Sequence, residues 1–272
     1  MGALVSTYVF APPAHSARQR ECKDVHFVDV PAIGVCIPVL YVTSGRTDTR
    51  PTTLLLAHGN AEDLTLIEPF VRFLVRRLGV AVAAFEYPGY GNSMWLDKND
   101  SDQLLPSEAR TYAAADAAFR WLCERVPSSD IILYGRSLGS GAAVHLAVCC
   151  ALEGVPCGGL ILHSPIASVV RVVAPRICAT LPLVDMFVNI DKIGQINCRA
   201  TVMHGTRDAV VPLTCARQLD AAIPDALRST PLYIEGGGHN DLQQCGTALV
   251  DHIDAFIACC AASATVNGDS VV

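Results

Sequence analysis

The stretch ILYGRSLGSG, residues 132–141, constrains the possible fold more than any other part of the chain. A short apolar run leads into the pattern G-x-S-x-G, and an Ala-rich helical segment follows directly. The two glycines let the chain reverse tightly, so that Ser137 stands above the end of a strand in a strained backbone conformation. The helix expected to begin at Leu138 directs backbone N–H groups toward an oxyanion. This strand–turn–helix is a nucleophile elbow, and it requires a sheet covered by helices.

Short apolar runs rich in β-branched residues alternate with helical patterns, which predicts parallel strands joined by crossover helices. The predicted strands are Val25–Val30, Val35–Val42, Thr53–Ala57, Val80–Phe85, Ile131–Tyr134, Gly159–Leu162, Ala200–Met203 and Leu232–Ile234. The predicted helices are Asp63–Leu78, a segment capped by Ser107 and ending near Val126, Leu138–Leu152, Leu213–Ile223 and Asp241–Cys260. No helix fits between the first two strands, so we expect them to form an antiparallel hairpin.

One large α/β domain can account for all 272 residues, because domains of this class reach about 250 residues or more. A long segment between two predicted strands, Ser164–Cys198, is interrupted by prolines and is expected to form a small cap. The expected organisation is an N-terminal tail at 1–20, a domain at 21–260 with its cap at 164–198, and a disordered tail at 261–272.

Composition excludes several classes of protein. The apolar content of 51% is too high for a disordered chain, and the charged content of 17% is too low for a coiled coil. The net charge of −6 argues against a nucleic-acid partner. The twelve cysteines form no Cys-x-x-Cys pair and no zinc-like set with histidine, so we expect small core residues, a reducing compartment, and neither metal nor cofactor.

A serine hydroxyl needs a base and an orienting acid, and behind a nucleophile elbow these follow in the order acid, then histidine. Asp208 lies in a loop after a predicted strand, and His239 follows three glycines after the next one. Taken singly, Asp208 could be a turn-forming residue and His239 a loop residue or helix cap; the three contexts together favour catalysis. The remaining histidines considered are expected to be structural: His26, His145, His163 and His204.

Two turns supply further candidates. His58-Gly59-Asn60 follows a predicted strand, and we expect the backbone N–H of Asn60 to complete an oxyanion hole with that of Leu138. The segment FEYPGYGNS, residues 85–93, ends another strand on the same side of the sheet. Its Tyr87 and Tyr90 either line the substrate pocket or merely pack within the loop.

Six blocks carry a family resemblance: HGNAEDL, FEYPGYGNS, ILYGRSLGSG, LHSPIAS, MHGTRDAVVP and GGGHNDL. In this order, from Thr52 to Ile257, they resemble the α/β-hydrolase superfamily. More narrowly, they resemble its domain-containing group seventeen, which are membrane-associated protein depalmitoylases, and the related bud-emergence-type serine hydrolases. The resemblance implies an α/β-hydrolase fold, with a mostly parallel eight-stranded sheet, helices on both faces and a small cap. It also implies Ser137 as nucleophile, Asp208 as acid and His239 as base.

The N-terminus departs from that group. Those depalmitoylases begin with a palmitoylated cysteine cluster, whereas here no cysteine precedes Cys22. Instead MGALVS fits the N-myristoylation pattern, which makes Gly2 a lipidation candidate. The first ten residues contain no basic residue, so no secretory signal peptide is predicted. We therefore expect a cytoplasmic protein, peripheral on the cytosolic face of a membrane.

The preferred interpretation is a monomeric, metal-free serine hydrolase that cleaves an acyl thioester or ester through an acyl-enzyme. Palmitoyl groups on protein cysteines are its expected substrates, so its partner is an acylated protein or a lipid or ester. Three alternatives stay open. They are a serine peptidase of the prolyl-oligopeptidase type, a general lipid or carboxylester hydrolase, and a non-enzymatic binding module.

Overall fold

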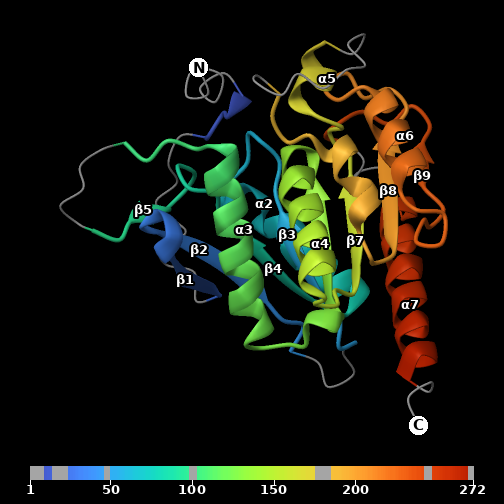
Figure 1. Cartoon of the computed structure of the whole chain (residues 1–272), viewed down its shortest axis with the longest axis horizontal. Helices are drawn as coiled ribbons and strands as arrows, with labels where there is room; N and C mark the ends of the chain where they lie inside the picture. The colour runs from blue at the N-terminus through green and yellow to red at the C-terminus, as the bar shows by residue number, and fades with distance from the viewer. Residues whose placement is uncertain are drawn as a thin grey trace.

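The computed structural model describes residues 9–13, 24–45, 50–97, 103–174, 185–241 and 247–268. Three expectations therefore lie outside the described residues: the lipidation candidate Gly2, part of the cap at 175–184, and the last residues from 269 onward. Within the described part, one open, mostly parallel sheet carries helices on both faces (Figure 1).

The described strands form one sheet in the order β1-β2-β4-β3-β6-β7-β8-β9, with β5 paired to β2 beside this path. Their bounds are β1 (Val25–Val30), β2 (Val35–Val42), β3 (Thr53–Ala57), β4 (Ala81–Phe85), β5 (Met94–Trp95), β6 (Ile131–Arg136), β7 (Gly159–His163), β8 (Ala200–Gly205) and β9 (Leu232–Ile234). From β4 to β9 along this order every pair is parallel. The expected antiparallel hairpin of β1 and β2 is confirmed.

The predicted count of eight strands is one too low, because β5 adds a ninth to the described sheet. Two residues carry no alternating pattern, so nothing in the sequence marks this strand. It forms because the chain returns beside the start of β2, where Val35 lies opposite Trp95 and Leu96 N–H donates to Gly34 O over 2.9 Å.

The helices begin largely where their capping residues predict. Their bounds are α2 (Leu64–Leu78), α3 (Glu108–Cys123), α4 (Ser140–Glu153), α5 (Val169–Val173), α6 (Leu213–Ala222) and α7 (Ala248–Gly268). Asp63 Oδ1 accepts the N–H of Leu66 over 2.9 Å, and Ser107 Oγ accepts that of Arg110 over 3.3 Å. Each side chain satisfies one backbone donor that the first helical turn leaves unpaired.

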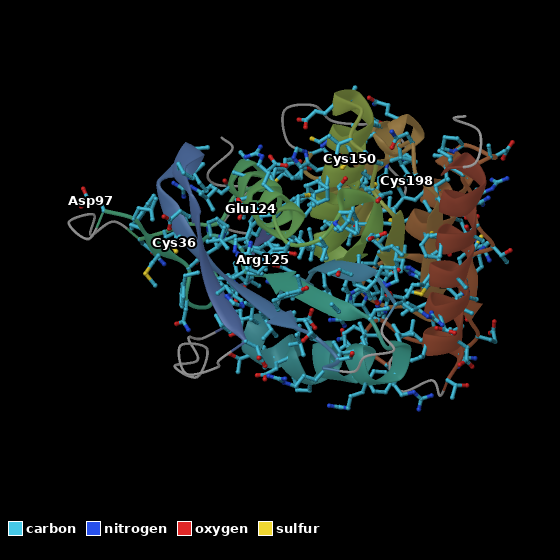
Figure 2. All side chains as sticks on the ribbon, turned by 90° about the horizontal axis from the view of Figure 1, so that it is seen from below. Cys36, Asp97, Glu124, Arg125, Cys150 and Cys198 are labelled. Atoms are coloured by element: carbon cyan, nitrogen blue, oxygen red, sulfur yellow. The ribbon has the colours of Figure 1, made fainter. Side chains whose placement is uncertain are left out.

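Two apolar cores lie on opposite faces of the sheet. One joins the sheet to α2 and α7, and the other joins it to α3, α4 and α6. Figure 2 shows the sheet between α2 on one side and α3 and α4 on the other. Helix α4 is apolar nearly all round and is buried along most of its length, as expected of a helix packed in the middle of a layer.

Helices α4 and α7 differ most from their predicted bounds. The elbow is a 3₁₀ turn, η4 (Ser137–Gly139), so the α-helix begins at Ser140 rather than Leu138. Helix α7 begins at Ala248 rather than Asp241 and continues to Gly268, so the expectation of disorder from 261 is wrong up to that residue. Its extension, AASATV, contains no helix-stopping residue and begins with two alanines, the best helix formers.

The parallel strands end at one edge of the sheet, their carboxyl edge. The loops that follow β3, β6, β8 and β9 therefore meet there, although they lie far apart in the sequence. In open α/β sheets this edge is where ligands bind.

Candidate active site

Ser137 lies at the tip of the turn between β6 and α4. Its φ of 52° is in the left-handed region that non-glycine residues seldom occupy, so the strain predicted for this position is confirmed. Gly135 permits the turn, because a Cβ there would lie 2.6 Å from the Cα of Ser140. Gly139 lets the turn pack directly against the end of β3, since a Cβ would overlap the backbone carbonyl groups of Ala57 and His58.

Asp208 and His239 come from the loops after β8 and β9 and converge on Ser137. The imidazole Nδ1 of His239 lies 2.7 Å from Asp208 Oδ2, and its Nε2 lies 3.0 Å from Ser137 Oγ. A carboxylate can only accept, so Nδ1 carries the proton and Nε2 accepts from the serine hydroxyl. The ring thus connects an acid and a hydroxyl through its opposite nitrogens, which is the arrangement that deprotonates a serine.

The carboxylate of Asp208 is fully buried, while the imidazole of His239 is 8% exposed. The other carboxylate oxygen, Oδ1, accepts the backbone N–H groups of Val210 and Val211 over 2.9 and 2.8 Å. Burial raises the pKa of Asp208, but the hydrogen bonds from His239 and Val211 outweigh it and lower the pKa below its ordinary value. Asp208 is therefore ionised when it orients His239.

Two further histidines lie near this group, and each has a hydrogen-bond partner at one ring nitrogen and none among the described residues at the other. The structural role expected for both stays a prediction. His163 Nδ1 lies 2.7 Å from the hydroxyl of Tyr134, and His204 Nε2 lies 3.0 Å from the carbonyl oxygen of Val211. Burial lowers the pKa of both imidazoles, so neither adds a positive charge beside His239 near neutral pH.

The turn at residues 58–60 begins next to the elbow, because the backbone of Ala57 and His58 lies directly against Gly139. The oxyanion-hole roles of the Asn60 and Leu138 N–H groups stay a prediction. The Asn60 side chain holds this turn in place. Its Nδ2 donates to Val9 O over 2.6 Å, and its Oδ1 accepts from Ala11 N over 2.9 Å and from the Tyr90 hydroxyl over 2.7 Å. The N-terminal segment 9–13 is thereby attached to the site.

Of the two roles left open for Tyr87 and Tyr90, the structure supports packing and not the lining of an open pocket. Both rings are fully buried. The Tyr87 hydroxyl donates to the carbonyl oxygen of His58 over 2.6 Å, and Tyr90 donates to Asn60. These side chains support the 58–60 turn from within because a buried hydroxyl must find a partner.

A buried ion pair lies under the same turn and carries no sequence signal. His58 Nδ1 is 2.8 Å from Gly59 O, and its Nε2 is 2.9 Å from Glu86 Oε1. Both partners can only accept, so the ring carries a proton on each nitrogen and is an imidazolium. Burial lowers the pKa of His58, but the hydrogen bond and charge of Glu86 raise it above its ordinary value.

Arg136, the second residue of the elbow motif, links three loops through its guanidinium group. Its guanidinium pairs with Glu62 through Nη1 and donates to Asn240 Oδ1 over 2.9 Å through Nη2. Glu62 in turn accepts the N–H of Gly59 over 2.7 Å. The serine turn, the 58–62 turn and the histidine loop are thus tied together. The motif leaves this position unspecified, so the sequence gives no sign of the role.

Comparison with known proteins gives the same architecture. A family model described as "Serine aminopeptidase, S33" matches residues 49–190. Alpha/beta hydrolase domain-containing protein 17C of Mus musculus is 37% identical over 193 residues, covering 70% of this chain and 55% of the relative. Alpha/beta hydrolase domain-containing protein aho-3 of Caenorhabditis elegans is 35% identical over 207 residues, covering 75% and 57%. The aligned part is little more than half the length of these relatives.

Solved structures show the same fold at low identity. An esterase of Pyrococcus furiosus superimposes with a TM-score of 0.64 at 16% identity, covering 91% of this chain and 98% of the esterase. Est1E of Butyrivibrio proteoclasticus, solved with ferulic acid bound, gives a TM-score of 0.63 at 16% identity, covering 86% and 99%. Among the described helices, none combines the length and apolar character needed to cross a bilayer.

Proposed function

The chain belongs to the α/β-hydrolase family represented by the serine aminopeptidase S33 model, and from this premise we propose that it is a serine hydrolase of acyl thioesters or esters. One observation carries the proposal: His239 bonds to Asp208 and to Ser137 through opposite ring nitrogens. A histidine held in this way can pass a proton between the serine and a leaving group.

In the proposed reaction Ser137 Oγ attacks the carbonyl carbon while His239 Nε2 takes the hydroxyl proton. Asp208 stabilises the imidazolium that forms, and the N–H groups of Leu138 and Asn60 bind the oxyanion. Collapse of the tetrahedral intermediate breaks the bond to the thiol or alcohol, which leaves with the proton from His239. Water then attacks the acyl-serine, with His239 as the base, and releases the carboxylic acid.

For the substrate, we propose palmitoyl groups on protein cysteines at a membrane surface. The resemblance of the six sequence blocks to membrane-associated depalmitoylases supports this choice. Myristoylation of Gly2 stays part of this proposal, and the mass of the N-terminal peptide tests it.

A second candidate is peptide hydrolysis, which the description of the matching family model favours. The two are separated by offering S-acyl peptides of increasing chain length and aminoacyl-amide substrates to one preparation. Preference for long S-acyl chains supports depalmitoylation. Preference for aminoacyl amides or short polar esters contradicts it and leaves the hydrolase mechanism intact.

The mechanism itself is tested by labelling with a fluorophosphonate probe. Ser137→Ala is expected to abolish labelling and to lower kcat about 10⁶-fold, the loss typical of a missing nucleophile. Ser129→Ala, an exposed serine just before the amino end of β6, is the matched control and should retain both. Labelling that persists in Ser137→Ala would contradict the proposal. If the probe does not label the wild-type protein, the result favours the binding-module alternative.

A further inference from the structure

A second group of reactive side chains lies between α3 and α4, in the helical layer on one face of the sheet. Asp116 comes from α3, and His145 and Cys149 come from α4. One ligand atom of each lies within 4.8 Å of the other two. His145 Nε2 is 3.0 Å from Asp116 Oδ1 and 3.6 Å from Cys149 Sγ. These side chains are partly exposed, so an ion from solvent can reach them.

The geometry suits chelation better than proton transfer. In a catalytic relay the acid and the nucleophile occupy opposite nitrogens of the imidazole. Here the carboxylate lies on Nε2, and the sulfur is also nearer to Nε2 than to Nδ1, from which it is 3.9 Å away. The sulfur is thus not placed across the ring from the carboxylate, and the arrangement of Asp208, His239 and Ser137 is not repeated here. Three donors of different chemical elements instead lie within 4.8 Å of one another.

The donor types select the ion. Thiolate and imidazole favour borderline transition metals over Mg²⁺ and Ca²⁺, which prefer oxygen ligands alone. Two anionic ligands, Asp116 and the Cys149 thiolate, neutralise a divalent cation. In tetrahedral zinc sites the metal lies about 2.0–2.3 Å from each nitrogen, oxygen or sulfur ligand, so ligand atoms separated by 3.0 and 3.6 Å can share one ion.

Neighbouring residues hold the imidazole in place. Tyr112 stacks on His145 with ring centroids 4.2 Å apart and an angle of 10° between the planes. The Tyr112 hydroxyl donates to Glu108 over 2.6 Å, and Lys192 Nζ donates to that hydroxyl over 3.0 Å. These contacts restrict rotation of the imidazole.

We propose that Asp116, His145 and Cys149 bind one divalent transition-metal ion, with Zn²⁺ as the preferred ion and a solvent molecule as the fourth ligand. Binding releases the thiol proton of Cys149 to solvent. The ion links α3 to α4, the helix that begins at the elbow, so it stabilises the layer that supports Ser137 without entering the reaction. No step of the proposed hydrolysis depends on it.

The test is titration of the purified full chain with Co²⁺ as a spectroscopic substitute, then displacement by Zn²⁺. One Co²⁺ per chain should give a thiolate-to-metal charge-transfer band and the visible bands of tetrahedral coordination. Cys149→Ser should abolish the charge-transfer band. His145→Asn and Asp116→Asn should each weaken Zn²⁺ binding by more than about 100-fold, since outer-shell changes alone cost 10- to 100-fold.

Cys157→Ser is the matched control because Cys157 is the central member of another thiol group, with hydrogen-bonding contacts to Cys150 and Cys198. A band that survives Cys149→Ser but disappears in Cys157→Ser would overturn the proposal, as would a wild-type chain that binds no Co²⁺. Fluorophosphonate labelling of Ser137 in each variant shows that the variant is folded. With Zn²⁺ about 100-fold above its Kd, Tm should rise by about 5–10 °C in the wild type and not in Cys149→Ser.

Discussion

Two histidine–aspartate pairs in this chain contain the same two side chains but differ in the position of the third side chain beside them. His239 and Asp208 lie 2.7 Å apart in loops at the carboxyl edge, and His145 and Asp116 lie 3.0 Å apart on neighbouring helices. In the first pair, Asp208 contacts Nδ1 of His239 and Ser137 contacts Nε2, the opposite ring nitrogen. In the second pair Cys149 lies nearer the same nitrogen as the acid. The position of the third side chain on the ring is therefore what distinguishes the proposed proton relay from the proposed metal site.

Burial widens this difference. The Asp208 side chain is fully buried and ionised by its hydrogen bonds, whereas that of Asp116 is 28% exposed. A buried carboxylate acts strongly on one neighbour because water does not screen it. A partly exposed group leaves room for an ion and its solvent ligand. The loop pair is thus suited to orienting one proton, and the helical pair to exchanging a ligand with solvent.

Among the changes that compare the two pairs, replacing Asp208 by its amide should have the largest effect. Asp208→Asn should lower kcat about 10⁴-fold, because the amide favours the wrong tautomer of His239. Asp116→Asn, its matched control, should leave hydrolysis within about twofold. Steady-state kinetics on one acyl substrate measures both. Equal losses in the two variants would erase the distinction between the pairs.

In a third histidine–acid pair, His58 and Glu86, both ring nitrogens of the histidine face acceptors. This pair should contribute to the stability of the fold and not to the reaction. Glu86→Gln places an amide where the imidazolium donates, and breaking a buried ion pair costs about 3–5 kcal/mol of unfolding free energy. Chemical denaturation measures it. Glu68→Gln, in a partly exposed pair with Arg72 on α2, is the control and should cost no more than about 1 kcal/mol.

The same pair predicts how stability depends on pH. The folded-state pKa of His58 is raised, so the stability contribution is fully present below the unfolded pKa of about 6.5. It is lost as pH rises through the folded value. Glu86→Gln should remove this component, and an unchanged pH profile in the variant would show that His58 is not an imidazolium.

The smallest expected effect comes from the contacts that position the His239 loop relative to Ser137. Helices hold His145 and Asp116, but the His239 loop is tied to the serine turn through Arg136 and Asn240. Arg136→Lys keeps the charge and loses the two-pronged contact, so kcat should fall about 10²-fold, with KM little changed. Asn240→Ala should show part of this loss. Arg125→Lys, two residues after the end of α3, should show none. A change confined to KM would contradict a positioning role.

How much of this was predictable differs between the fold and the site. Every predicted strand is present, and the caps Asp63 and Ser107 mark their helices correctly, because these signals are local. The convergence of Ser137, Asp208 and His239 was also foreseeable, since the loops after parallel strands meet at one edge. The choice between the two roles left open for Tyr87 and Tyr90 was not foreseeable. Nothing in the order of residues says whether a loop aromatic faces solvent or packs beneath a neighbouring turn.

The amino-acid sequence by itself therefore determined the strand–helix alternation, the strained serine turn and the order of the three proposed catalytic residues. Those features depend on backbone sterics and on patterns within a few residues. Only the tertiary structure decided the pairing of β5, the imidazolium at His58, the Arg136 brace and the meeting of Asp116 with His145 and Cys149. Each of these joins residues from separate elements, and their chemistry depends on distances of a few ångströms that arise only when the layers pack.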